Sequence, residues 1–169
     1  MKCVNVRSKE IDDIVSRQEA PLKVTVDKLE LVRCNKDYVE NAKAVVFHYN
    51  DTHQAVNASW KLIKDLGMDL KDNVDIYGVE SDGPHLMSTA KDINICDILG
   101  GGFPELEELF KFGNFTKCPM KAGYYGATNA ILDTSKVPPN APKGTFMLDI
   151  KTSEGDVEIA NCKLTITIA

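Results

Sequence analysis

Apolar and polar residues alternate with a period of two along several segments of this chain, and this restricts its fold more than any other feature. The clearest segment spans residues 56–62, where even positions are apolar and odd positions are polar. The even positions are Val56, Ala58, Trp60 and Leu62. Because side chains of a strand point alternately to its two faces, the pattern predicts a strand with Trp60 on the buried face and Asn57 on the other.

Similar segments elsewhere predict an all-β fold. We expect further strands over residues 22–34, 42–49, 73–79, 146–151 and 162–168. The alternation changes phase near Asp27 and Lys28, which predicts a β-bulge. A polar turn at 153–156 joins the last two strands into a hairpin, and the prolines of 138–142 mark a sheet edge or a crossing between sheets. Seven or eight short strands indicate a two-sheet antiparallel β-sandwich of the immunoglobulin-like kind.

A short helical insert is predicted around residues 88–112. We expect a helix over 88–99, a break at the three glycines of 100–102, and a second short helix over 104–110 with Pro104 in its first turn. The insert gathers five large apolar residues: Phe103, Leu106, Leu109, Phe110 and Phe112. One small helix would not bury all of them, so they either cover the core or form a flexible lip that contacts lipid or membrane.

Composition and motifs exclude several function classes. The net charge is −5 and the basic residues are scattered, which argues against a nucleic-acid partner. No apolar run approaches the roughly 20 residues that span a bilayer, so we expect a soluble protein. The chain has no GxSxG or HExxH motif and no ordered Ser/His/Asp arrangement, and its carboxylates fall on surface positions. We therefore predict no catalytic residues, no cofactor and no enzymatic activity.

Five cysteines leave two alternatives for the compartment. No two of the cysteines form a CxxC pair, and all of them lie far in sequence from the three histidines, so we predict no metal site. Disulfides would place the protein in a secreted or lumenal compartment, whereas five buried thiols would fit the cytosol. Three sequons favour the first alternative and make Asn50, Asn57 and Asn114 candidate glycosylation sites. The first residues are polar, so a secreted protein would be a mature form with an added Met1.

Several short motifs and single residues follow one another in the C-terminal half: CDIL at 96–99, CPMKAGYY at 118–125, PPNAPKG at 138–144, Gly155 and Cys162. In order and approximate spacing they resemble the ganglioside activator-like branch of the ML-type lipid-recognition domains, weakly from Leu22 and strongly from Cys96 onward. A large arthropod branch of this group has members linked to chemosensory tissue. The resemblance divides the chain into an N-terminal extension (1–20) and one lipid-recognition domain (21–169).

That resemblance implies a β-cup, with an apolar cavity between two splayed sheets and the insert near its mouth. It implies a disulfide between Cys96 and Cys118 that closes the insert, and a second between Cys162 and an N-terminal cysteine, Cys3 being the first choice. Cys34 would then be left without a partner. The chain lacks the activator's two further small-loop disulfides, and its N-terminal extension also departs from that pattern, so a ganglioside is not implied as the ligand.

The inward apolar positions form either a packed core or a cavity wall, which the sequence pattern does not distinguish. The candidate ligand-binding residues are Trp60, Leu62, Val74, Ile76, Phe103, Leu106, Leu109, Phe110, Tyr125, Phe146, Leu148, Leu164 and Ile166. Selectivity is expected at the mouth, in the segments 81–85 and 100–112.

Two functions remain. The first is non-enzymatic binding and transport of a lipid or other small hydrophobic molecule, with transient membrane contact and presentation to a hydrolase or receptor. The second is a secreted structural or receptor-accessory module with a filled core that acts through protein–protein contacts.

Overall fold

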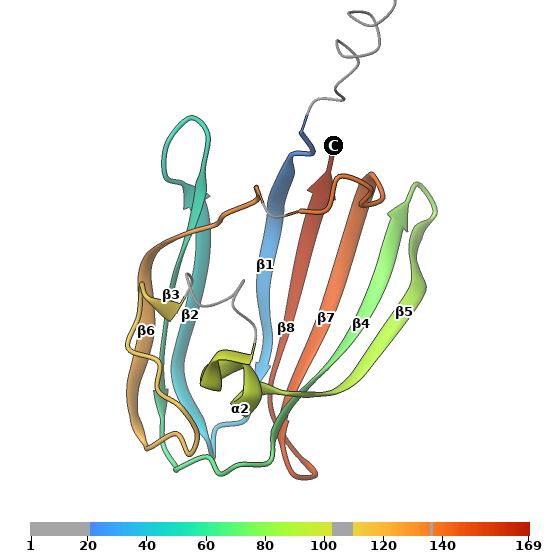
Figure 1. Cartoon of the computed structure of the whole chain (residues 1–169). Helices are drawn as coiled ribbons and strands as arrows, with labels where there is room; N and C mark the ends of the chain where they lie inside the picture. The colour runs from blue at the N-terminus through green and yellow to red at the C-terminus, as the bar shows by residue number, and fades with distance from the viewer. Residues whose placement is uncertain (1–20, 103–109, 136) are drawn as a thin grey trace, which may run out of the picture.

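The computed structural model describes residues 21–102, 110–135 and 137–169. Eight strands dominate the described chain (Figure 1). They are β1 (Val24–Cys34), β2 (Val39–His48), β3 (Gln54–Leu62), β4 (Leu70–Glu80), β5 (Gly83–Asn94), β6 (Gly123–Ile131), β7 (Gly144–Glu154) and β8 (Val157–Ile168). A short helix α2 (Ile95–Asp97) and a π-helical turn η1 (Ile98–Gly102) follow β5. The predicted extension at 1–20 lies outside the described residues.

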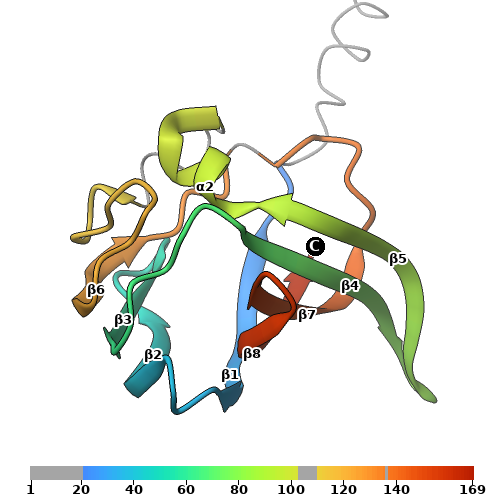
Figure 2. The same cartoon turned by 90° about the horizontal axis from the view of Figure 1, so that it is seen from below.

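The strands form two antiparallel sheets, as predicted. One sheet has five strands in the order β1-β8-β7-β4-β5, and the other has three in the order β2-β3-β6. The sheets lie in two layers that approach each other at β1 and β2, while β5 and β6 form the opposite edges (Figure 2). The connection from β6 to β7 carries the chain from one sheet to the other, so the prolines of 138–142 lie in a crossing.

Other local predictions also agree with the structure. The pairing of β1 with β8 shifts register between Val26 and Lys28, so the bulge near Asp27 is confirmed. Strands β7 and β8 pair as a hairpin through a turn in which Gly155 has a φ of 57°. A positive φ is readily adopted by glycine, which explains this residue in the tight turn.

The helix predicted over 88–99 is wrong for most of its length. Residues 83–94 instead form strand β5, which pairs with β4 as an edge strand of the five-stranded sheet. Helix formation begins at Ile95, where the Asn94 side chain accepts a hydrogen bond from the backbone N–H of Asp97 at 3.2 Å. Pairing with β4 supplies the backbone hydrogen bonds of this segment. The spacing of its apolar residues resembles that of a helix and does not indicate this pairing. The helical insert therefore starts at 95 instead of 88.

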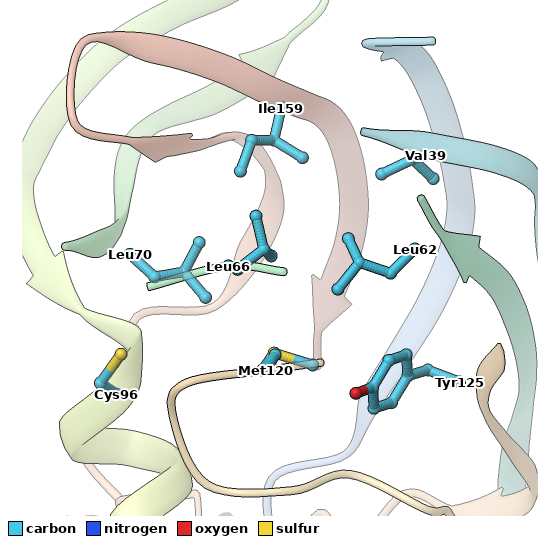
Figure 3. Close-up of a cluster of buried hydrophobic side chains, with 8 residues drawn as sticks. All are labelled: Val39, Leu62, Leu66, Leu70, Cys96, Met120, Tyr125 and Ile159. Carbon is cyan, nitrogen blue, oxygen red and sulfur yellow. The ribbon is translucent and has the colours of Figure 1, made fainter. Parts of the chain in front are cut away.

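A cluster of buried apolar side chains lies at the end of the sandwich that carries α2. They come from both sheets and from the segments beside the insert, and Figure 3 shows them converging. They are Val39, Leu62, Leu66, Leu70, Cys96, Met120, Tyr125 and Ile159. The bridge between Leu66 and Met120 ties two loops into this cluster, with N–H to carbonyl distances of 2.8 and 2.9 Å.

Along the rest of the five-stranded sheet, the inner face is apolar, but its central row is not deeply buried. Ile76, Leu148 and Leu164 are directly paired neighbours on β4, β7 and β8. All three side chains are only half-buried, although they occupy the middle of a sheet. In a filled sandwich such a central row would be covered by the opposite sheet, so the two layers do not close completely over it.

Among the described residues, none of the helices has the length and apolar character required to span a bilayer.

Candidate binding cavity

A cavity of about 480 Å³ lies between the sheets at the end where the buried cluster is found. This volume falls within the roughly 300–1,000 Å³ typical of small-molecule pockets. Its wall is built by both sheets, the insert and the loops beside it. The apolar lining consists of Leu31, Cys34, Val39, Ala42, Ala44, Ala58, Trp60, Leu62, Leu66, Leu70, Ile95, Ile98, Leu99, Phe110, Phe115, Met120, Ile159 and Ala160.

Aromatic rings form a continuous series along one wall. The Phe110 and Phe115 rings are 5.6 Å apart in an edge-to-face arrangement, and Phe115 lies 5.5 Å from Trp60. Trp60 in turn stacks on Tyr125 at 6.2 Å. The Tyr125 hydroxyl donates to the backbone oxygen of Lys121 at 2.5 Å, which fixes the ring at the end of the series. Phe110, Phe115 and Trp60 line the cavity itself.

A disulfide joins α2 to the segment that follows the insert. Cys96 in α2 and Cys118 after the insert are bonded, with 22 residues of sequence separation, which is the pairing that the resemblance implied. Cys118 belongs to the segment that also carries Met120 to the cavity wall. The disulfide therefore ties two parts of the wall to each other.

Four of the described lining residues have polar side chains: Lys43, Ser59, Asp72 and Thr152. Lys43 and Ser59 are paired across β2 and β3, and both are exposed. Asp72 and Thr152 are paired across β4 and β7, both are half-buried, and the Thr152 hydroxyl donates to Asp72 Oδ1 at 2.5 Å. Burial raises the pKa of the Asp72 carboxyl, and the hydrogen bond from Thr152 opposes part of that increase.

Two cysteines on the inner face of the five-stranded sheet are unpaired in the described structure. Cys34 lines the cavity, and Cys162 is paired in register with Leu31, another lining residue. Burial raises the pKa of both thiols, and for Cys162 the nearby charges of Asp72 and Asp149 add to the increase. Cys3 lies outside the described residues, so its predicted bond to Cys162 stays a prediction.

The structure brings part of the predicted ligand-binding set together. Trp60, Leu62 and Phe110 line the cavity, and Tyr125 stacks behind Trp60. Phe103, Leu106 and Leu109 lie outside the described residues. The remaining six share the inner face of the five-stranded sheet beyond the lining: Val74, Ile76, Phe146, Leu148, Leu164 and Ile166. Their contact with a ligand stays a prediction.

Sequence reasoning missed several wall residues for identifiable reasons. Phe115, Met120 and Leu66 lie in irregular segments, where no periodicity indicates which side chains point inward. Asp72 could have been found, because it is two residues from Val74 on the same strand and so lies on the same face. Its charge made it resemble a surface residue.

The described residues of the predicted mouth contribute little to the cavity wall. Residues 81–85 form the β4–β5 hairpin and are absent from the lining, and from the segment 100–112 only Phe110 contributes among its described residues. A second hollow of about 640 Å³ borders the β1–β2 connection and shares four wall residues with the cavity. These are Leu31, Cys34, Val39 and Ala42. The two hollows therefore adjoin each other along β1 and the start of β2.

The β4–β5 hairpin holds the one group of potential metal ligands found among the described residues. Glu80, Asp82 and His85 have ligand atoms within 4.8 Å of one another, and all three are exposed. His85 Nε2 lies 2.8 Å from Asp82 Oδ1. An exposed carboxylate–histidine cluster of this kind also occurs without a metal, and it lies outside the cavity lining.

The three sequon asparagines differ in their contacts. Asn50 is exposed in the β2–β3 turn, where its Oδ1 accepts from the backbone N–H of Thr52 and of His53. Asn57 is half-buried, and its Oδ1 accepts from the backbone N–H of Asn129 at 2.7 Å. Asn114 uses both ends of its amide, since Nδ2 donates to Tyr124 O at 2.7 Å and Oδ1 accepts from Gly126 N–H at 2.9 Å.

Comparison with known proteins finds similarity among solved structures alone. No family profile matches the chain, and no curated protein matches it. Among solved structures, the chain is similar to a Niemann-Pick type C2 protein from the Japanese carpenter ant, with 14% sequence identity and a TM-score of 0.40. That match covers 82% of this chain and 96% of the ant protein.

Proposed function

We propose that this protein is a non-enzymatic carrier that holds a lipid or another small apolar molecule between its two sheets. The observation that carries the proposal is the cavity of about 480 Å³, whose described wall is apolar except at four positions. Removing one methylene from water is worth about 0.8 kcal/mol, so a chain of a dozen carbons contributes roughly 10 kcal/mol before the losses from immobilisation. Few polar contacts are then needed for useful affinity.

The proposal includes membership in the ML-type lipid-recognition domains. It is supported by the order of the sequence motifs from Cys96 to Cys162 and by the Cys96–Cys118 disulfide that closes the insert. A disulfide also fits a secreted or lumenal compartment. In such a compartment the carrier would take its ligand from a membrane and deliver it to a hydrolase or a receptor.

Filling the cavity provides the test. Ala44 and Ala58 are paired across β2 and β3, both line the cavity, and both are half-buried. A phenylalanine at either position would occupy ligand space. Purified protein would be titrated with the neutral fluorescent probe N-phenyl-1-naphthylamine, and native mass spectrometry would record any bound mass that disappears on denaturation.

We expect the wild-type chain to bind the probe and the Ala44→Phe variant to bind it at least tenfold more weakly. Val45→Phe is the matched control, because Val45 is the next residue on β2, is 54% exposed and is absent from the described lining. Absence of probe binding and of any bound mass in the wild-type chain would count against the carrier and favour a module that acts through protein contacts.

A further inference from the structure

We propose that Asp72 is the specificity-determining residue of the cavity and that it takes ligands whose apolar body ends in a hydrogen-bond donor. An alcohol or an amine fits this description, whereas a carboxylate does not. The inference rests on the proposed carrier function and adds the chemical class of the ligand's head group.

Asp72 has an acceptor that the protein leaves unused. Its Oδ1 accepts from the Thr152 hydroxyl at 2.5 Å, across the paired strands β4 and β7. Neither a hydrogen bond nor an ion pair reaches its other oxygen, Oδ2, from any residue in the described ranges 21–102, 110–135 and 137–169. Both residues line the cavity and are half-buried, so this oxygen would lose water when an apolar ligand enters.

The other polar lining residues do not provide an equivalent group. Lys43 and Ser59 are exposed, while their neighbours Ala42, Ala44, Ala58 and Trp60 on the same strands are half-buried. In a strand this alternation places Lys43 and Ser59 toward the solvent face. Asp72 and Thr152 are thus the polar side chains that an occupant of the described cavity would meet.

The surroundings of Asp72 favour a ligand head group that donates a hydrogen bond over an acidic head group. The ionisable groups that share the inner face with it are Cys162 on β8 and Cys34 on β1. Cys162 experiences the negative charges of both Asp72 and Asp149, and none of the ion pairs between described residues includes Asp72. A ligand carboxylate beside Asp72 would therefore place two acids together in a poorly solvated site, where at least one must take up a proton.

A hydroxyl or ammonium head group would instead satisfy Oδ2. Leaving a buried acceptor without a partner costs more than the net gain from a typical hydrogen bond, and hydrogen bonds to charged groups are the stronger ones. A site with such a group discriminates against an isostere that lacks the donor. We expect about tenfold or greater discrimination between ligands that share one chain and differ only in this donor.

The experiment compares four ligands with the same twelve-carbon chain in displacement of N-phenyl-1-naphthylamine at pH 7.5. They are 1-dodecanol, dodecylamine, 1-methoxydodecane and dodecanoic acid. The wild-type chain should bind the alcohol and the amine at least tenfold more tightly than the methyl ether and the acid. The Asp72→Ala variant should lose that preference while it retains the probe.

Two further variants separate the role of Asp72 from a general effect of removing a charge. Asp75→Ala is the matched control, because Asp75 lies on the same strand and accepts from a threonine, Thr89, at 2.8 Å, but is absent from the lining. It should keep the wild-type order of ligands. Asp72→Asn keeps the size of the side chain but removes the charge that disfavours an acid, so it should lose the preference for alcohol and amine over dodecanoic acid, which provides a second measurement if Asp72→Ala folds poorly.

The outcomes distinguish this inference from the carrier function itself. If the wild-type chain binds the probe and all four ligands displace it equally, the carrier function stands and the role of Asp72 is overturned. A preference for dodecanoic acid would also overturn it. If no ligand displaces the probe and none is bound in native mass spectra, the carrier function fails first.

Discussion

Trp60 on β3 and Phe115, in the irregular segment before Cys118, lie with their ring centroids 5.5 Å apart and both line the cavity. This contact joins the three-stranded sheet to the segment that follows the insert. It also places the single tryptophan of the chain beside the space that a ligand would occupy.

Trp60 should therefore report ligand entry directly. A twelve-carbon alcohol that carries bromine at its far end is expected to quench the tryptophan emission, because the heavy atom would come into contact with the indole ring. Unbrominated 1-dodecanol serves as the control for changes in polarity. Saturable quenching that 1-dodecanol reverses would agree with binding between the sheets, and unchanged emission at concentrations that displace the fluorescent probe would place the ligand elsewhere.

Asp72 should make the stability of the ligand-free protein depend on pH in a defined direction. Burial raises the pKa of this carboxyl in the folded state above its value in the unfolded chain. Its contribution to stability is then full below the unfolded pKa and is lost as pH rises through the folded pKa. Asp72→Asn should match the wild type at low pH and become more stable than it as pH rises through that window.

Thr152→Val should act in the opposite sense. The Thr152 hydroxyl lowers the pKa of Asp72, so its removal should raise that pKa further and extend the loss of stability to higher pH. Urea unfolding of the wild type and both variants at a series of pH values would measure the free energy of unfolding. Parallel curves for all three proteins would contradict this account of Asp72.

The Cys96–Cys118 disulfide should contribute substantially to stability. It joins two cysteines separated by 22 residues in sequence. In the chain-entropy treatment, closing a loop of this length contributes about 3 kcal/mol to the free energy of unfolding. The Cys96→Ser, Cys118→Ser double variant should lose about this amount in urea unfolding. Cys34→Ser is the control, because Cys34 is unpaired in the described structure. A double variant as stable as the control would mean that the bond adds little.

Phe110 should affect ligand transfer more than its neighbour Phe112. Phe110 lines the cavity and contacts the Phe115 ring, whereas Phe112 is 36% exposed and is absent from the described lining. We expect Phe110→Ser to slow the transfer of a fluorescent lipid from phosphatidylcholine vesicles to the protein several-fold, and Phe112→Ser to have a smaller effect. Equal effects of the two changes would assign both residues to a common membrane-contacting lip.

The strand pattern predicted the sandwich because period-two alternation depends on local geometry that each strand carries by itself. Trp60 and Leu62 were placed on the inner face for this reason. The same pattern did not predict the strand at 83–94. This strand lies at the edge of the sheet and most of its residues are exposed, so its apolar and polar residues do not mark a buried and an exposed face.

The location of the cavity depends on contacts that the pattern does not contain. Leu148 and Leu164 have the same alternation as Leu62, yet only Leu62 lies in the lining, because the sheets approach each other and the insert near one end. Phe115 and Met120 reach the wall through loops held by the Cys96–Cys118 bond and by the Leu66–Met120 bridge. Such long-range restraints determine which of the inward-facing residues line the cavity.

Glycosylation should distinguish the three sequons by what their amides already contact. The glycan is attached to the side-chain nitrogen, and in Asn114 this atom donates to Tyr124 O at 2.7 Å, next to the edge of β6. Asn57 is half-buried and bonded to β6. Asn50 lies in an exposed turn and uses only its oxygen, so its nitrogen points to no acceptor among the described residues. We expect Asn50 to be the most fully occupied site when the chain is secreted from eukaryotic cells.

Glycopeptide mass spectrometry would measure the occupancy at each sequon, with Asn50→Gln as the reference that should remove most of the attached mass. Because attachment precedes or accompanies folding, a chain whose folding is slowed by loss of Cys96 and Cys118 should show higher occupancy at Asn114 than the wild type does. Full occupancy of Asn114 in the wild-type chain would mean that its hydrogen bonds to Tyr124 and Gly126 form too late, or too weakly, to protect it.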